Sequence, residues 1–330
     1  MGDWFQHRSS DWRDWALADL LEAKRRRGIR ISLVVPAYNE AGTVGAIVSR
    51  LRRDLMESAP LVDEIIVIDS DSTDSTSEEA HAAGANVYLA AEIRPDLGIR
   101  RGKGEAMWKS LFVTRGDVLV FIDADLTEWD SHFVTGLLGP LLLEPDVQLV
   151  KGFYDRPLIP DGRPEQAGSL LEGGRVTELM ARPLLALRWP ELGVVVQPLS
   201  GEWAIRRELF EQLAVPTGYG VEMGVLVDTY LHGGLEAIAQ VDLGRRVHGH
   251  QSLRDLGAMA LEILAIADRR SGGLRSSEQT VRLLQYNPGD HGSIPVRRDV
   301  VIDERPSARS VLRHDDQSAV EKPDRGLSGC

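Results

Sequence analysis

Cysteine, long apolar runs and an excess of positive charge are all missing from this sequence of 330 residues. The one cysteine, Cys330, excludes an intramolecular disulfide and indicates a reducing, cytoplasmic setting. The longest apolar tract runs from Phe133 to Leu143, contains Pro140 and ends before Glu144. Because a bilayer needs roughly 20 apolar residues, we expect no membrane span.

Positive charge is in short supply. With 38 Lys and Arg against 50 Asp and Glu, the formal net charge is −12. That balance argues against a protein that grips a nucleic-acid backbone or an anionic membrane. Any anionic ligand must therefore meet a local basic cluster. The 43% of apolar and 27% of charged residues fit a globular protein of one large domain or two.

Two phosphate-binding signatures are also missing. No G-x-G-x-x-G follows the first predicted strand, which weighs against a dinucleotide dehydrogenase. Gly98 and Gly102 are too close in sequence for a Walker loop. Gly102-Lys-Gly104 does open a predicted helix, where a lysine beside flexible glycines can meet a phosphate or a base. The alternative is a helix cap with a solvated Lys103.

Strands and helices are expected to alternate in the first part of the chain. The predicted strands are residues 31–36, 64–69, 86–90 and 118–123, and the predicted helices are residues 14–24, 43–55, 72–84 and 104–113. Nearly continuous apolar strands with short connections indicate an α/β fold, in which a parallel sheet is covered by helices on both faces. For residues 271–330, where the apolar pattern weakens, we expect an extended or flexible tail that is either free or wrapped on a partner.

Ligands of such sheets bind beyond the carboxyl ends of the strands, where Asp123-Ala-Asp125 follows a predicted strand. In an extended strand, residues i and i+2 point to the same side about 7 Å apart, so both carboxylates face one site. Paired carboxylates suit a hard divalent ion, with one binding metal and the other a water or a ribose hydroxyl. The alternative is that they cap the next turn.

Three later segments add candidate polar groups. Gly173-Gly-Arg-Val-Thr177 combines backbone amides, a guanidinium and a hydroxyl, which suits a phosphate, although Arg175 could instead pair with a neighbouring glutamate. Gln197-Pro-Leu-Ser-Gly-Glu202 and Gly218-Tyr-Gly-Val-Glu222 resemble tight turns that each deliver a carboxylate. His248-Gly-His250 is a weaker candidate, since a lone histidine is more often structural than a ligand.

Together these segments resemble the retaining GT-A glycosyltransferases, and more narrowly the actinobacterial glucosyl-3-phosphoglycerate synthases and the related mannosyl-3-phosphoglycerate synthases. The most specific matches are Gly173-Gly-Arg-Val-Thr-Glu-Leu179 and Gln197-Pro-Leu-Ser-Gly-Glu202. The other matching segments are Val35-Pro-Ala-Tyr-Asn-Glu40, Asp69-Ser-Asp-Ser-Thr-Asp74, Gly102-Lys-Gly-Glu-Ala106, Asp123-Ala-Asp125, Ala181-Arg-Pro-Leu-Leu185, Gly218-Tyr-Gly-Val-Glu222 and Ala237-Ile-Ala-Gln240. Three positions depart from the family pattern: Tyr38 stands for a Leu, Asp71 for a Gly and His250 for an Asn.

The resemblance implies a role for each matched residue. The donor would bind to Pro36, Ala37, Tyr38, Glu40, Ser70, Lys103 and Asp123. The acceptor would bind to Gly174, Arg175, Val176, Thr177 and His250. The catalytic groups would be Asp123, Asp125, Glu222 and the carbonyl of Leu199. Asp125 and His248 would hold Mg²⁺, or another divalent ion such as Mn²⁺, as the cofactor.

The implied reaction is metal-dependent transfer of glucose from UDP- or GDP-glucose to 3-phosphoglycerate, with retention of configuration. Two alternatives stay open: GDP-mannose as the donor, and a nucleotide-sugar sensor without turnover. The implied fold is GT-A, a Rossmann-like nucleotide-binding sheet with helices on both faces, a mixed acceptor-binding region and C-terminal helices. The predicted divisions are residues 1–30, 31–130, 131–270 and 271–330. A homodimer built with C-terminal helices is expected.

Overall fold

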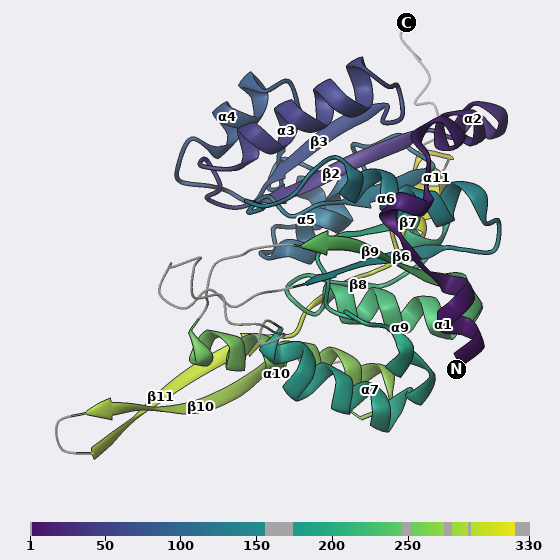
Figure 1. Ribbon diagram of the computed structural model, residues 1–330. Coiled ribbons are helices and arrows are strands. Elements are labelled where there is room, and N and C mark those ends of the chain that lie inside the picture. The colour runs from purple at the N-terminus through teal and green to yellow at the C-terminus, as the bar shows by residue number, and fades with distance from the viewer. Residues whose placement is uncertain (1, 156–173, 246–251, 274–278, 290–291, 321–330) are drawn as a thin grey trace, which may run out of the picture.

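The computed structural model describes the whole chain except residues 1, 156–173, 246–251, 274–278, 290–291 and 321–330. One eight-stranded sheet forms its centre (Figure 1). In spatial order the strands are β1 (Ser9–Asp11), β9 (Ile238–Arg245), β6 (Leu149–Asp155), β7 (Trp203–Arg206), β5 (Val118–Phe121), β2 (Ile31–Ala37), β3 (Glu64–Asp69) and β4 (Asn86–Leu89). All pairings within it are parallel except those of β7, which runs antiparallel to both β5 and β6.

Helices cover both faces of the sheet, as the sequence predicts (Figure 1). The helices against one face are α2 (Leu17–Arg27), α3 (Val44–Arg52), α4 (Thr76–Ala82) and α6 (His132–Leu143). The helices against the other face are α5 (Lys103–Ser110), α7 (Arg182–Arg188), α9 (Val221–Gly233), α10 (Leu253–Arg270) and α11 (Ala308–Val320). Leu33 and Val35 join the first core while Val34 joins the second, so β2 must be apolar throughout.

Pro36 lies within β2, a central strand, although proline cannot donate a ladder hydrogen bond. The backbone groups of Val34 face β5, since its carbonyl accepts from Ile122 N (3.2 Å). Pro36 has the same orientation two residues on, and the pairing of β2 with β5 ends at Val34. Its missing N–H therefore costs no ladder bond, and β2 continues to Ala37, whose carbonyl accepts from Ser70 N (2.9 Å).

The strands predicted within residues 31–123 pair in parallel, as expected, and β7 makes the whole sheet mixed because it runs antiparallel to both β5 and β6. One expectation about the fold needs correction. The described part of residues 271–330 is not an extended or flexible tail. It forms the hairpin of β10 (Thr280–Gly289) and β11 (Gly292–Val301), then β12 (Glu304–Arg305), which pairs with β8 (Val215–Pro216), and then α11.

The predicted divisions at residues 30, 130 and 270 stay predictions. One sheet joins the first three segments, because β1 pairs with β9 and β7 pairs with β5. Two further short helices are α1 (Gly2–Arg8) and α8 (Arg207–Phe210). Within the described ranges, no helix combines the length and apolar surface needed to cross a membrane.

Candidate active site

The site lies at the carboxyl ends of β2, β3 and β5, where the sequence places its polar clusters. The loops after β2 and β3 are tied together by short hydrogen bonds. Asn39 N donates to Ser72 Oγ (2.9 Å), Thr73 N donates to Asn39 Oδ1 (2.8 Å), and Glu40 N donates to Thr76 Oγ1 (2.7 Å). Asn39 has a φ of 57°, in the left-handed region that asparagine tolerates.

The residues expected to bind the donor nucleoside line this pair of loops. Ala37 is buried, Pro36, Glu40 and Ser70 are half-buried, and Tyr38 is exposed. The Tyr38 ring therefore offers a free aromatic surface beside a fixed backbone. Such a surface suits stacking on a planar base.

Lys103 is the centre of the site. Its ammonium lies 2.5 Å from Asp123 Oδ1 and 2.8 Å from Glu222 Oε1. Burial opposes the charge, but the attraction of Asp123 and then of Glu222 outweighs it and raises the pKa of Lys103 above its usual range. One cation thus bridges two carboxylates that come from distant parts of the chain.

Three elements bring this triad together. Asp123 follows β5, Lys103 is the first residue of α5 and Glu222 lies in the first turn of α9. Gly102 has a φ of 126°, and a Cβ there would collide with the carbonyl of Thr217. Glycine is therefore required for the start of α5 to approach the segment that leads into α9.

The turn at residues 199–202 and the buried Lys151 support the Asp123 carboxylate. A Cβ at Gly201 would collide with the Asp123 carboxylate, so the turn between Leu199 and Glu202 lies directly against it. Lys151 Nζ donates to the carbonyl of Ser200 in that turn (2.6 Å) and lies 5.8 Å from the centre of the Trp203 ring. Burial lowers the pKa of Lys151 to about 7.

Asp125 and Glu40 form the acidic rim of the site. Asp125 is exposed, and burial followed by the charge of Asp125 raises the pKa of Glu40 above its usual value. An excess of carboxylate charge beside Asp125 fits a divalent cation with oxygen ligands. Among the described residues, no three His, Cys, Asp or Glu side chains form a complete metal site. His248, the other metal ligand that the family resemblance implies, lies outside the described residues.

The expected acceptor residues lie in the segment before α7. Gly174 has a φ of 78°, Thr177 is buried, and Arg175 and Val176 are half-buried. Residues Thr177–Ala181 form a π-helical turn that runs into α7, rather than an ordinary α-helix. A π-turn at this point widens the helix start beside Arg175, which is a feature often found at functional sites.

Two histidines remain from the sequence candidates, and Arg245 precedes them in the chain. His248 and His250 lie outside the described residues. Arg245 lies 3.7 Å from Glu128, and both side chains are largely exposed. Of the two turns expected to deliver carboxylates, one delivers Glu222 to the site. The other buries Glu202, which accepts from the Tyr154 hydroxyl (2.7 Å).

Comparison with known proteins agrees with this geometry. The sequence model of the family "Glycosyl transferase family 2" matches residues 32–213. Glucosyl-3-phosphoglycerate synthase of Petrotoga mobilis is 39% identical over 310 residues, covering 93% of this chain and 94% of that protein. Its counterpart in Mycolicibacterium paratuberculosis is 48% identical over 269 residues, covering 82% and 80%. The chain belongs to the glucosyl-3-phosphoglycerate synthases of glycosyl transferase family 2.

A solved structure of this family extends the likeness to the fold. The glucosyl-3-phosphoglycerate synthase of Mycobacterium tuberculosis, in complex with Mn²⁺, UDP and phosphoglyceric acid, superposes with a TM-score of 0.79. It is 43% identical, and the match covers 90% of this chain and 95% of that one. The predicted GT-A class of fold is thereby confirmed, with helices on both faces of the sheet.

Sequence reasoning missed the supporting residues of this synthase site. Lys151 gave one signal, a lone lysine inside the apolar run from Leu149 to Tyr154. A buried charge in such a run indicates a dedicated partner. Glu262 of α10, which accepts from Gly220 N (3.2 Å), gave no local signal because its partner is a distant backbone amide.

Proposed function

We propose that this chain transfers glucose from UDP-glucose to 3-phosphoglycerate, giving glucosyl-3-phosphoglycerate and UDP. The observation that carries the proposal is the bridge of Lys103 between Asp123 and Glu222, at the sheet edge where Asp125 also lies. It is supported by likeness to a relative solved with UDP and phosphoglyceric acid. Glucose is proposed over mannose because the relatives with high identity carry the glucosyl name.

The nucleoside would lie on the loops after β2 and β3. Pro36, Ala37 and the exposed Tyr38 ring offer apolar and aromatic surface, and Glu40 and Ser70 offer hydrogen-bonding groups. A uracil base has a planar face and an edge of donors and acceptors, so it needs both kinds of contact. The sugar hydroxyls would replace part of the ion pairing that now joins Lys103, Asp123 and Glu222.

Asp125 and His248 would hold the divalent ion, Mg²⁺ or Mn²⁺. The bound ion would supply Lewis acidity and neutralise charge on the departing diphosphate. Related synthases have been solved with Mg²⁺ and with Mn²⁺, in each case together with UDP. Asp123, already neutralised by Lys103, is left to accept hydrogen bonds from the ribose or the sugar.

The phosphate and carboxylate of 3-phosphoglycerate would bind at Gly174, Arg175, Val176 and Thr177, with His250 at the acceptor side. A guanidinium with adjacent backbone amides is well suited to a doubly anionic acceptor. Gly174 and Thr177 lie on the same helical start, so the amides and the Arg175 side chain come from one rigid segment. Rigid placement lowers the entropy lost on binding.

Retention of configuration requires attack on the face that the diphosphate leaves. The acceptor hydroxyl oxygen would form the new bond to the anomeric carbon as the bond from that carbon to the diphosphate oxygen breaks. Its proton would pass to the departing phosphate oxygen. The carbonyl of Leu199, in the turn held by Lys151 through Ser200, would accept a hydrogen bond from the attacking hydroxyl and orient it.

A direct test is release of UDP in the presence of Mg²⁺, 3-phosphoglycerate and a panel of UDP-glucose, GDP-glucose and GDP-mannose. We expect fast release with UDP-glucose that depends on both the acceptor and the metal. Release no faster than in the control without acceptor would contradict transferase activity and favour a sensor. Faster reaction with GDP-mannose would favour the mannosyl alternative.

We further propose that the chain acts as a homodimer in the cytoplasm. The single cysteine supports a reducing compartment. The hairpin of β10 and β11 extends away from the body of the molecule (Figure 1), and it exposes Leu284, Tyr286 and Ile294. Apolar side chains on a projecting arm favour a second copy as their partner.

A further inference from the structure

The strongest unassigned feature is a buried arginine behind the active site. Arg305 belongs to β12, and its side chain is 3% exposed. It meets Glu105 of α5, 2% exposed, through two hydrogen bonds: Nε to Oε2 (2.7 Å) and Nη2 to Oε1 (2.6 Å). Such a fork-to-carboxylate pair is directional as well as charged.

Arg305 also holds the loop that precedes Lys103. Its Nη1 donates to the carbonyl of Leu97 (2.6 Å), and its Nη2 donates to that of Gly98 (2.8 Å). These hydrogen bonds of the Arg305 side chain are thus all made to α5 or to the segment that leads into α5. The guanidinium also lies 5.0 Å from the ring centre of Trp108.

A second basic side chain, Lys109 of α5, holds the earlier part of the same loop. Lys109 Nζ donates to the carbonyls of Ile93 and Arg94, and it lies 3.9 Å from Glu105. Glu105 therefore lies between two buried cations, each of which anchors one part of residues 93–98. Burial lowers the pKa of Lys109.

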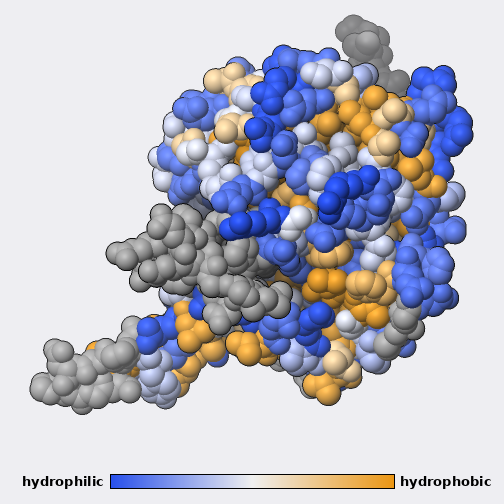
Figure 2. Space-filling view, in the orientation of Figure 1, coloured by the Kyte–Doolittle hydropathy of each residue, from blue (hydrophilic) through white to orange (hydrophobic). Residues whose placement is uncertain are grey.

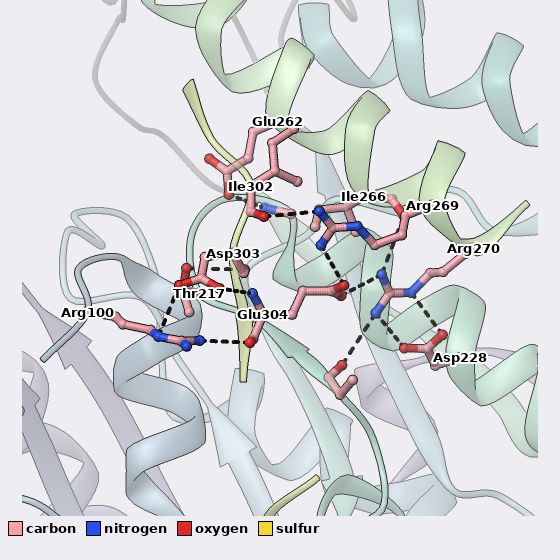
Figure 3. A network of polar contacts seen from close by, with 12 residues as sticks. Arg100, Thr217, Asp228, Glu262, Ile266, Arg269, Arg270, Ile302, Asp303 and Glu304 are labelled. Atoms are coloured by element: carbon pink, nitrogen blue, oxygen red, sulfur yellow. Dashed lines mark hydrogen bonds and ion pairs between the residues drawn. The ribbon is translucent and has the colours of Figure 1, made fainter. Parts of the chain in front are cut away.

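Arg305 belongs to residues 302–306, here called the C-terminal brace, and both of its neighbours along the chain are held by hydrogen bonds. The Glu304 carboxylate accepts from Arg269 Nη1 (2.9 Å) and Arg270 Nη1 (2.7 Å), both from α10 (Figure 3). The Glu304 carbonyl accepts from Arg100 Nη1 (2.7 Å), and the Pro306 carbonyl accepts from Trp108 Nε1 (2.9 Å). Both neighbours of Arg305 are therefore fixed to the body.

The brace also reaches the segment that leads to Glu222. Thr217 N donates to the carbonyl of Asp303 (2.9 Å), while Glu105 N donates to the carbonyl of Thr217 (2.8 Å). The segment before α9 is thus hydrogen-bonded to the start of α5 on one side and to the C-terminal brace on the other. Lys103 lies at the start of α5, and Glu222 follows the segment before α9.

We propose that Arg305 is a positioning residue for Lys103, so that the C-terminal brace sets the geometry of the donor site. Arg305 fixes Leu97, Gly98 and Glu105 on either side of Lys103. Loss of the guanidinium removes the hydrogen bonds that hold residues 97–98 and Glu105. The backbone at Lys103 can then shift, and its ammonium is no longer held at a fixed position relative to Asp123 and Glu222. A displacement of about 1 Å can reduce a rate by a factor on the order of 100.

The test uses the full-length double variant Glu105→Met/Arg305→Met, with Arg305→Lys as the conservative variant. Replacing both members of a buried ion pair with apolar groups is often nearly neutral for stability. In the double variant Lys109 loses Glu105 but keeps its hydrogen bonds to the carbonyls of Ile93 and Arg94, so the anchor that is removed is the one at Leu97 and Gly98. Arg282→Met removes an exposed ion pair on the hairpin (2.9 Å to Asp299) and is the matched control.

The first measurement is amide hydrogen exchange over residues 97–105. We expect exchange at least tenfold faster in the double variant, a smaller increase in Arg305→Lys and no change in Arg282→Met. Unchanged exchange in either folded Arg305 variant would overturn the proposal. This readout needs no substrate, so it decides the role of Arg305 even if the chain transfers no glucose.

The second measurement is kinetic and rests on the proposed function. We expect kcat/KM for UDP-glucose to fall at least tenfold in the double variant, while KM for 3-phosphoglycerate changes less than twofold. A purely structural role would lower the melting temperature and leave both constants unchanged well below it. Absence of transfer by the parent chain would count against the proposed function, not against the loop anchoring.

Discussion

At the scale of single residues, the main feature of the candidate site is a group of like-charged carboxylates. Asp123, Glu222, Asp125 and Glu40 gather at one end of the sheet, and Lys103 pairs directly with the first two. Carboxylates this close repel one another, and a cation between two of them offsets that repulsion. The lysine therefore holds Asp123 and Glu222 together, while Asp125 is left for a metal.

Lys103→Met should reduce kcat/KM for UDP-glucose by a factor on the order of 100, as is usual for loss of a preorganised charge. Methionine leaves the Asp123 and Glu222 carboxylates without the cation that they share. Steady-state kinetics with UDP-glucose as the varied substrate measures the loss. Lys24→Met, which breaks a 2.9 Å ion pair to Asp63 at the opposite end of β2, is the control and should leave kcat/KM unchanged. An unchanged kcat/KM in Lys103→Met would contradict the role given to Lys103.

Asp125→Ala should abolish the dependence of UDP binding on Mg²⁺. Titration calorimetry of UDP with and without Mg²⁺ measures this, and we expect the parent to bind at least tenfold more tightly with the metal. Asp146→Ala, at an exposed aspartate, is the control and should behave like the parent. Equal enhancement by Mg²⁺ in Asp125→Ala would remove Asp125 from the metal site.

Sequence reasoning reached some of these residues and not others. Asp123 and Asp125 were predictable as polar residues just beyond a buried strand, although the strand ends at Phe121 and Asp125 lies in a turn, so the extended spacing does not apply to the pair. The contact of Lys103 with Glu222 was not, since it depends on how α5 and α9 pack, and no local pattern encodes that packing. The polar side chain of Lys151 was visible inside an apolar run, but its acceptor, the Ser200 carbonyl, was not.

At the scale of elements, α10 supports the turn that opens α9. Glu262 accepts from Gly220 N (3.2 Å), and a Cβ at Gly218 would collide with its carboxylate. Burial raises the pKa of Glu262 to about 7. A carboxyl group with a raised folded-state pKa favours folding at low pH, and this contribution is lost as pH rises from about 4.5 to 7.

Glu262→Gln should therefore stabilise the fold at high pH, because the amide keeps an acceptor for Gly220 N without a charge. The gain over the parent should grow between pH 4.5 and 7 and then level off, at on the order of 1 kcal/mol. Thermal unfolding across this range measures it, with exposed Glu208→Gln as the control. A difference that does not vary with pH would contradict the assignment.

Elements were predicted well where apolar periodicity is strong and poorly where it is weak. Strands β2 and β3 match their predicted ranges to within one residue. The hairpin of β10 and β11 was missed because Arg, Asn, Pro and Gly interrupt its apolar residues, several of which are exposed, among them Leu284, Tyr286 and Ile294. Its strands are held by pairing with each other rather than by a buried face, so hydrophobic patterning carries little signal.

At the scale of the whole molecule, a chain with a net charge of −12 is proposed to bind anionic substrates. Figure 2 shows hydrophilic residues spread over most of one face of the molecule, with apolar patches between them. The net charge of −12 excludes a general polyanion surface, but local cations such as Lys103 and Arg175 lie where the proposed anionic substrates would bind. Selectivity for small phosphorylated ligands follows from this contrast.

A homodimer predicts a solution mass near twice the chain mass of 36.4 kDa. Light scattering coupled to size-exclusion chromatography measures it. Leu284→Asp/Tyr286→Asp places charge on the exposed arm and should shift the mass to that of a single chain. A parent that elutes as a single chain at micromolar concentration would exclude the dimer.

The identity of the product is the most direct test of the proposed glucosyl transfer. Incubation of the chain with UDP-glucose, 3-phosphoglycerate and Mg²⁺, followed by proton NMR of the product, reports both the bond formed and its configuration. We predict glucosyl-3-phosphoglycerate with an α-anomeric signal, and no product after chelation of the metal. A β-anomeric signal would contradict retention, and the absence of a glucosylated acceptor would contradict the proposed function itself.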